Sequence, residues 1–233
     1  MNISYIYFDL DDTLLDHHNA EEAALEDVYD NFGFAKKISL NTLKQNYSSI
    51  NKKLWKQYSN GLIDRSILQR NRIEKTLEVL DLEPEKWRET AGYYKNAYKK
   101  HWQWIEGKRD IFEYIAEQYP TGLLTNGFAE VQKLKYEQFR FNEYVSNFII
   151  SEEVGVMKPQ SGIFEYATQK AEAEPAQILY IGDSLHSDVR GGSNYGWNVV
   201  WYNRLNESRQ SNQAVFSYTE PEELKKWISQ IAG

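Results

Sequence analysis

Two patterns of hydrophobic and polar positions divide the chain. Residues 3–8, ISYIYF, are β-branched and aromatic, which predicts a buried strand. From residue 17 to about residue 105, aromatic residues and leucines recur at helical spacing among polar residues, and no segment has the composition of a strand. After residue 107, short apolar runs alternate with amphipathic segments. The chain is therefore expected to combine an α/β part with an all-α block.

The all-α block is expected to contain about four helices. One helix is predicted over residues 40–61, with Gly61 as the residue that ends it. Another is predicted over residues 84–104, because Pro84 is favourable in the first turn of a helix.

The alternating part predicts a parallel sheet. The expected strands lie at 120–125, 146–151, 176–181 and 197–202, and the expected helices at 109–119, 128–139, 159–171, 186–195 and 221–231. Strands that alternate with helices are typical of a Rossmann-like, doubly wound α/β fold with helices on both faces of the sheet. The first strand can join this sheet only if the helical block is an insertion. We therefore expect an α/β core of residues 1–16 and 106–233, an inserted helical domain of residues 17–105, and a surface loop over 203–213.

Composition and charge narrow the classes of partner. The formal net charge of −7 argues against binding to a nucleic-acid polymer, which relies on an excess of Lys and Arg. A small phosphorylated metabolite remains possible, because a metal ion, a lysine and backbone amides can supply positive charge locally. No apolar stretch approaches the ~20 residues of a membrane span, and no basic leader precedes the first strand. With no cysteine in the chain, the expectation is a cytoplasmic protein without a membrane partner.

Three carboxylates follow the first strand directly, at Asp9, Asp11 and Asp12. Two ionised carboxylates ~4 Å apart repel by ~4 kcal/mol at the effective dielectric usual near a protein surface. Aspartates at such a junction are more often turn or helix-capping residues, and Asp12 is interpreted in that way. A cation or a reaction near Asp9 and Asp11 is the alternative.

Further polar residues follow the other predicted strands. Thr125 and Asn126 end the segment LLTN, Lys158 follows the strand FIIS, and Asp183 and Asp188 follow ILYI. Ligands bind at the carboxyl ends of strands in open parallel sheets, so these side chains are expected to converge. Each has a structural alternative on its own: a solvated surface position for Lys158, an exposed helix face for Asp188. Their convergence on one edge is more specific than any single residue.

The chain resembles the phosphohydrolases of the haloacid dehalogenase superfamily that carry a helical cap after the first strand. The motifs FDLDDTL, LLTNG, KP and GDSLHSD occur in that family's order, and the resemblance extends over essentially the whole chain. It implies that Asp9 is a nucleophile that forms an aspartyl-phosphate, and that Asp11 is the general acid and then the general base.

The same resemblance implies a magnesium site and a phosphate site. Mg²⁺ would be bound by the side chain of Asp9, the main-chain carbonyl of Asp11 and the side chain of Asp183. Thr125, Asn126 and Lys158 would bind the phosphoryl group, with Lys158 neutralising its charge. Asp188 would orient Lys158 or a metal-bound water from behind.

The segments FDLDDTLLD, TNG and GWNVVWYNR are most similar to bacterial pyrimidine 5′-nucleotidases. This implies nucleoside 5′-monophosphates as substrates, with phosphoglycolate or sugar-phosphate phosphatases and phosphomutases as alternatives. Asp11 argues against haloacid dehalogenation, since those enzymes lack the second aspartate. A receiver-like signalling module would need its acceptor aspartate after the third strand and no large insertion. An inactive binding scaffold would be expected to lack one of Asp9, Asp11, Lys158 or Asp183.

Overall fold

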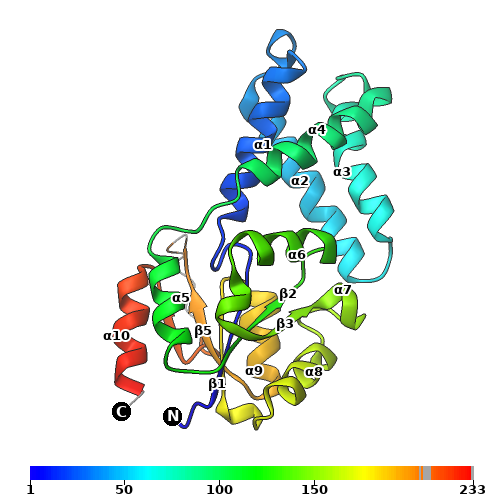
Figure 1. Cartoon of the computed structure of the whole chain (residues 1–233). Helices are drawn as coiled ribbons and strands as arrows, with labels where there is room; N and C mark the ends of the chain where they lie inside the picture. The colour runs from blue at the N-terminus through cyan, green and yellow to red at the C-terminus, as the bar shows by residue number, and fades with distance from the viewer. Residues whose placement is uncertain (205, 207–210, 232–233) are drawn as a thin grey trace. The chain divides into compact units, whose positions relative to one another are not determined.

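The computed structural model describes residues 1–204, 206 and 211–231. It contains two compact units, an α/β unit of Met1–Asp16 with Trp104–Gly233 and a helical unit of His17–Gln103 (Figure 1). The second boundary follows residue 103, whereas the sequence predicted it after residue 105. Part of the surface loop predicted over 203–213 lies outside the described residues.

The α/β unit is built on a six-stranded sheet in the order β3-β2-β1-β4-β5-β6, in which every neighbouring pair is parallel. Its strands are β1 Tyr5–Phe8, β2 Thr121–Thr125, β3 Val145–Ile150, β4 Ile178–Gly182, β5 Asn198–Tyr202 and β6 Phe216–Tyr218. β1 lies in the middle, with Ile6 paired to both Thr121 and Leu179. The first strand therefore pairs with strands that follow the helical unit in the sequence. The predicted parallel α/β fold is confirmed.

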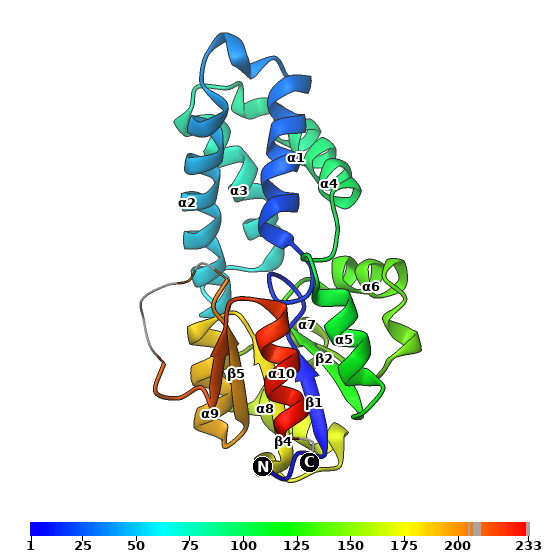
Figure 2. The ribbon, with the colours of Figure 1, turned by 90° about the vertical axis from the view of Figure 1, so that its left-hand side faces the viewer.

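Helices cover both faces of this sheet. They are α5 Lys108–Ala116, α6 Ala129–Gln138, α7 Ser151–Val154, α8 Ser161–Ala171, α9 Gly191–Tyr195 and α10 Pro221–Ile231. Side chains alternate along β1, so Ile6 and Phe8 join the core beneath α5 and α10, while Tyr5 and Tyr7 join the core beneath α8. Figure 2 shows α5 and α10 side by side over one face of the sheet.

Two local features differ from the sequence prediction. The segment expected as one helix over 186–195 is a π-helical turn, Leu185–Arg190, followed by the short helix α9. The strand β6 was not predicted, because three residues are too few for a periodic pattern. The π-helical turn matters for the site, since it carries Asp188, and such turns are frequent at functional sites.

The helical unit consists of α1 His17–Asn31, α2 Leu40–Ser59, α3 Arg65–Val79 and α4 Trp87–Lys100. Ser39 and Asp64 cap α2 and α3 by accepting main-chain N–H groups of Thr42 and Ile67. Gly61 follows the end of α2 with φ 69°, the left-handed conformation expected beyond a helix terminus. The helix predicted from Pro84 begins as a 3₁₀ turn, Pro84–Lys86, before α4. Among the described residues no helix is long and apolar enough to cross a membrane.

Candidate active site

Asp9 lies directly after β1, at the carboxyl end of the central strand. Its main-chain N–H donates to the carbonyl of Ile181 on β4 at 2.9 Å, which continues the sheet pairing into the loop. The side chain is buried. Its Oδ1 accepts from Lys158 Nζ at 2.6 Å, and its Oδ2 lies 3.3 Å from the Thr13 hydroxyl. The carboxylate is therefore held by two neighbours before any ligand binds.

Lys158 is the hub of the buried network. Its Nζ lies within hydrogen-bonding distance of four oxygens: Asp9 Oδ1 at 2.6 Å, Asp188 Oδ1 at 2.8 Å, the Tyr180 hydroxyl at 2.6 Å and the Leu124 carbonyl at 3.1 Å. Burial on its own would lower the pKa of Lys158. The carboxylates of Asp188 and Asp9 outweigh this effect and raise the pKa above the ordinary value, so Lys158 is a fixed positive charge.

Asp188 contacts this lysine and is fully buried. Its Oδ1 accepts from Lys158 and from the Tyr180 hydroxyl at 3.0 Å, while its Oδ2 accepts from the main-chain N–H of Ser184 at 2.9 Å. Gly182 provides the room, because a Cβ at that position would lie 2.6 Å from Asp188 Oδ2. Gly182 is the last residue of β4 and does not have a positive φ, so the space needed by Asp188 explains the glycine.

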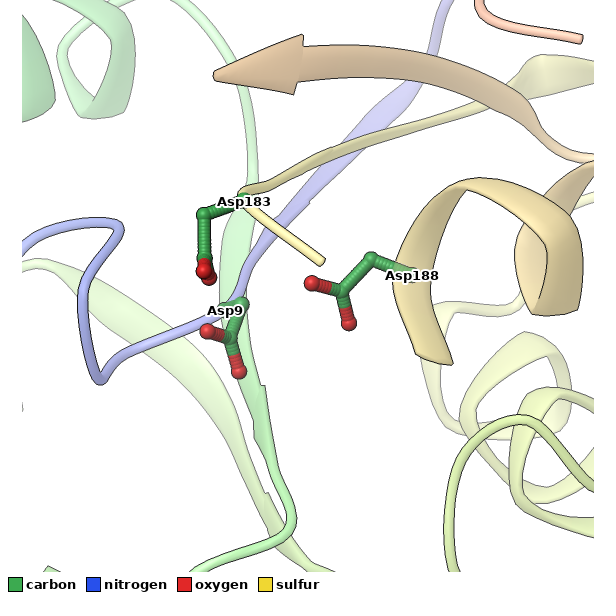
Figure 3. Close-up of side chains that lie close together, drawn as sticks. All are labelled: Asp9, Asp183 and Asp188. Carbon is green, nitrogen blue, oxygen red and sulfur yellow. The ribbon is translucent and has the colours of Figure 1, made fainter. Parts of the chain in front are cut away.

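Three carboxyl groups approach one another at this edge, from Asp9, Asp183 and Asp188 (Figure 3). Each offers an oxygen within 4.8 Å of the others. Burial raises the pKa of Asp183 well above its ordinary value, and the charges of Asp9 and Asp188 add to the effect. Burial likewise raises the pKa of Asp9 to about 7, against the opposing influence of Lys158. Clustered hard oxygen donors with this much mutual repulsion fit a divalent cation such as Mg²⁺.

Asp11 takes no part in that cluster. Its side chain turns toward α6, where Oδ2 accepts from Gln132 Nε2 at 2.8 Å and Oδ1 accepts from Lys135 Nζ at 2.5 Å. The sequence prediction gave Asp11 a metal contact through its main-chain carbonyl, which leaves the side chain available for another task. Asp11 still lies close enough to Asp9 for its charge to contribute to the raised pKa of Asp9.

The predicted phosphate-binding residues lie at the ends of β2 and beyond β3. The buried Thr125 hydroxyl accepts the main-chain N–H of Gly127 at 3.2 Å. The side-chain amide of Asn126 is bonded to the main chain of Lys158, donating to its carbonyl and accepting from its N–H, both at 2.9 Å. Asn126 therefore fixes the loop that carries Lys158. Any contact of Asn126 with phosphate would come from its main-chain N–H.

Asp12 is a loop residue, with φ 62°. This left-handed conformation suits Gly, Asn and Asp, which is why an aspartate is tolerated here. Its carboxylate lies 3.3 Å from Arg204 Nη1, and the same guanidinium binds both oxygens of Asp16 at 2.8 Å. The contacts of Arg204 with Asp12 and Asp16 fix the segment between β1 and the helical unit.

Sequence reasoning missed three residues of this site: Gln132, Lys135 and Tyr180. Gln132 and Lys135 are three residues apart on α6 and so share one face of the helix. A lysine on the buried face of a helix was the available signal. Tyr180 lies within β4, in a run of apolar residues where its hydroxyl gave no separate signal.

A family model described as haloacid dehalogenase-like hydrolase matches residues 6–202, from within β1 to the end of β5. The chain belongs to this family of hydrolases. The pyrimidine 5′-nucleotidase YjjG of Escherichia coli is 32% identical over 211 residues, covering 87% of each chain. The pyrimidine 5′-nucleotidase PynA of Streptococcus pneumoniae is 29% identical over 226 residues, covering 94% of each chain.

Among solved structures, this hydrolase is similar to the HAD-hydrolase YfnB of Bacillus subtilis, which was crystallised bound to magnesium. The two share a TM-score of 0.85 and 24% identity, over 98% of this chain and 100% of YfnB. At that identity the likeness shows the fold alone.

Proposed function

We propose that this hydrolase removes the phosphoryl group from small phosphomonoesters by way of a phosphorylated Asp9, and that its substrates are nucleoside 5′-monophosphates with a preference for pyrimidine bases. The observation that carries the proposal is the Asp9 carboxylate itself. It is buried at the end of the central strand, fixed by Lys158 at 2.6 Å, and adjacent to the carboxyl groups of Asp183 and Asp188.

The first chemical step forms one bond and breaks another. A carboxylate oxygen of Asp9 attacks phosphorus, and the bond from phosphorus to the ester oxygen breaks. Asp11 donates a proton to that leaving oxygen. In the second step Asp11 takes a proton from water, whose oxygen attacks phosphorus and returns Asp9 to its carboxylate form. Asp11 thus ends the cycle protonated, as it began.

The remaining residues are proposed to manage charge. Lys158 would neutralise the transferring phosphoryl group, and the Thr125 hydroxyl with the main-chain N–H of Asn126 would hydrogen-bond its oxygens. The side chains of Asp9 and Asp183, with the main-chain carbonyl of Asp11, would hold Mg²⁺, and Asp188 would orient Lys158. When bound, Mg²⁺ supplies positive charge that offsets the repulsion among these carboxylates and the phosphate.

The substrate class is supported by the two nucleotidase relatives, YjjG and PynA, which cover 87% and 94% of the chain, helical unit included. The residues proposed to act on phosphate all lie in the α/β unit, so discrimination among substrates requires other groups. The helical unit offers buried aromatic rings and an arginine, as the pair of Arg72 and Tyr94 illustrates, with 5.3 Å between the guanidinium carbon and the ring centroid. Nucleoside 5′-monophosphates are cytoplasmic metabolites, so we expect the hydrolase to act in the cytoplasm.

A phosphate-release screen with Mg²⁺ tests the proposal. The substrates are UMP, dUMP and dTMP beside phosphoglycolate and glucose phosphates, with Asp9→Asn as the inactive control. We expect the highest kcat/KM for a pyrimidine nucleotide. A clear preference for phosphoglycolate or a sugar phosphate would overturn the substrate assignment and leave the phosphatase mechanism standing. Phosphate release from none of these esters would overturn both.

A further inference from the structure

Two buried side chains of α6 bind the carboxyl group of Asp11, and the steps proposed above give neither a role. Lys135 Nζ lies 2.5 Å from Oδ1, and Gln132 Nε2 lies 2.8 Å from Oδ2. Each oxygen of the carboxylate therefore has its own donor, and both donors come from one turn of one helix. This fixes the rotation of the carboxyl group as well as its position.

Burying two polar side chains is unfavourable, so a function for Lys135 and Gln132 is expected. Both Lys135 and Gln132 are only 1% exposed. A lysine is rarely buried without a partner, and immobilising either long side chain costs conformational entropy. Apolar contacts already attach the loop to the core, because Leu10 and Leu14 are both buried there. A simple structural tether would therefore not require two buried polar side chains on α6.

The glycine of the TNG motif is explained by the same contact. A Cβ on Gly127 would lie 1.6 Å from Gln132 Nε2 and 2.5 Å from Gln132 Cδ, so any other residue would exclude the amide from its place. Gly127 does not have a positive φ, so a special backbone conformation is not the reason for it. The glycine leaves the space through which Gln132 reaches Asp11.

Gln132 also keeps an unused group beside Asp11. Its Oε1 is buried and has no hydrogen-bond partner within the described part of the chain. The two ends of an amide have nearly the same shape, so a half-turn of the side chain would present an acceptor where the donor now lies. Gln132 can thus bind Asp11 as a carboxylate or as a carboxylic acid. A general acid that becomes a general base passes through both forms.

We propose that Lys135 and Gln132 are positioning residues that hold the Asp11 carboxyl group in the orientation from which it exchanges protons with the leaving group and water. This inference rests on the proposed function, in which Asp11 is the general acid and base. The side chains act through Asp11 and do not touch the substrate.

The test compares leaving groups. Lys135→Met and Gln132→Leu are assayed with UMP, whose alkyl oxygen needs protonation, and with p-nitrophenyl phosphate, whose leaving group hardly needs it. Since general acid catalysis contributes about 10²–10⁴-fold, we expect Lys135→Met to lower kcat for UMP by roughly 10- to 100-fold, with a smaller loss for the aryl ester and little change in KM. Lys135→Arg should recover part of the loss. The exposed Lys133 on the same helix provides the matched control, and Lys133→Met should match the wild type on both esters.

A double-mutant cycle with Asp11→Asn separates positioning from folding. In that background Lys135→Met and Gln132→Leu should cost no more than about threefold further, because their target is already gone. Equal losses on both esters, or losses that add fully to that of Asp11→Asn, would overturn the proposal. If Lys135→Met does not fold, Gln132→Leu and Lys135→Arg provide the same comparison. A wild-type level of activity in Asp11→Asn would instead contradict the proposed function itself.

Discussion

The two units both bury polar side chains, but they satisfy them differently. In the α/β unit, Lys158 Nζ contacts four oxygens, and the fully buried Asp188 accepts hydrogen bonds on both of its oxygens. In the helical unit, Glu21 Oε2 accepts from Asn51 Nδ2 at 3.0 Å. Within the described residues, however, Asn51 Oδ1 and Arg72 Nε are buried without a hydrogen-bond partner.

An unsatisfied buried polar group costs about 1–3 kcal/mol, so each one calls for an explanation, such as an ordered water, an ion or a ligand. Arg72 lies over the Tyr94 ring and next to the charge of Glu21, yet no acceptor among the described residues meets its Nε. The two units therefore differ in how completely their buried polar groups are satisfied. Lys158 and the carboxylates around it are fixed in advance in the α/β unit, where Gln132 Oε1 is a buried acceptor left unsatisfied among the described residues. In the helical unit Asn51 Oδ1 and Arg72 Nε are left unsatisfied in the same sense, which suits recognition of a ligand or an ordered water.

The largest expected effect comes from the fixed network. Asp9→Asn should lower kcat by about 10⁴-fold or more, because an amide does not attack phosphorus. Asp12→Asn is the matched control, three residues further along the same loop, where asparagine tolerates the left-handed φ of 62°. We expect it to remain within a few-fold of the wild type. A well-folded Asp9→Asn that keeps substantial turnover would remove Asp9 as nucleophile.

Removal of the metal is expected to be nearly as severe, and its effect on stability should depend on pH. Excess chelator should abolish turnover and Mg²⁺ should restore it. The pKa of Asp9 is raised from 3.8 to about 7, so the folded protein holds this proton more tightly than the unfolded chain. Stability from this group is present below pH 3.8 and is lost as the pH rises toward 7.

Mg²⁺ bound at Asp9 would replace that proton, so its stabilising effect should grow over the same range. We expect Mg²⁺ to raise Tm clearly at about pH 8 and little at about pH 5. Differential scanning calorimetry with and without Mg²⁺ measures this, with Asp9→Asn as control. An identical Tm shift at both pH values would contradict a metal site that includes Asp9.

A change in the helical unit should alter selectivity and leave the chemistry intact. Hydrogen bonds to charged groups contribute about 1.5–3 kcal/mol, so Arg72→Met should lower kcat/KM for UMP by roughly 10- to 100-fold. The value for p-nitrophenyl phosphate should change little. Arg70→Met, at an exposed ion pair with Glu74 on the same helix, is the control and should match the wild type. Equal losses on both esters after Arg72→Met would show that Arg72 does not recognise the substrate.

The smallest effect is expected from removing one hydroxyl group from the contacts of Lys158. Tyr180→Phe removes a hydroxyl that accepts from Lys158 at 2.6 Å and can donate to Asp188 at 3.0 Å. Lys158 keeps both carboxylates, so kcat should fall only about 2- to 10-fold, in line with a net ~0.5–1.5 kcal/mol per hydrogen bond. A loss as large as that of Asp9→Asn would show that the two carboxylates alone do not hold Lys158 in place.

The fold could be predicted from the sequence because the alternation of strands and helices is a strong periodic signal. Even the insertion followed from it, since the strand before Asp9 had to join the later ones. The strand Phe216–Tyr218 and the π-helical turn Leu185–Arg190 were not predicted. The first is too short for a period, and the second occupies part of a segment whose pattern is that of an ordinary helix.

The site could be predicted as far as strand ends determine it. The structure brings Asp9, Lys158, Asp183 and Asp188 together because parallel strands present their carboxyl ends at one edge. The partners of Asp11 could not be deduced in this way, since they depend on which face of α6 turns inward. The reasons for Gly127 and Gly182 were also hidden, because both provide space for side chains that lie five and six residues further along the chain.

The central step of the proposed mechanism is the transfer of the phosphoryl group to Asp9. The decisive measurement is rapid acid quenching of the hydrolase during turnover of UMP with Mg²⁺, followed by peptide mass spectrometry. We predict that the peptide containing Asp9 gains the mass of one phosphoryl group, and that Asp9→Asn shows no such gain. Continuous phosphate release with no phosphorylated peptide at any quench time, or a phosphoryl group on another side chain, would show that Asp9 is not the nucleophile.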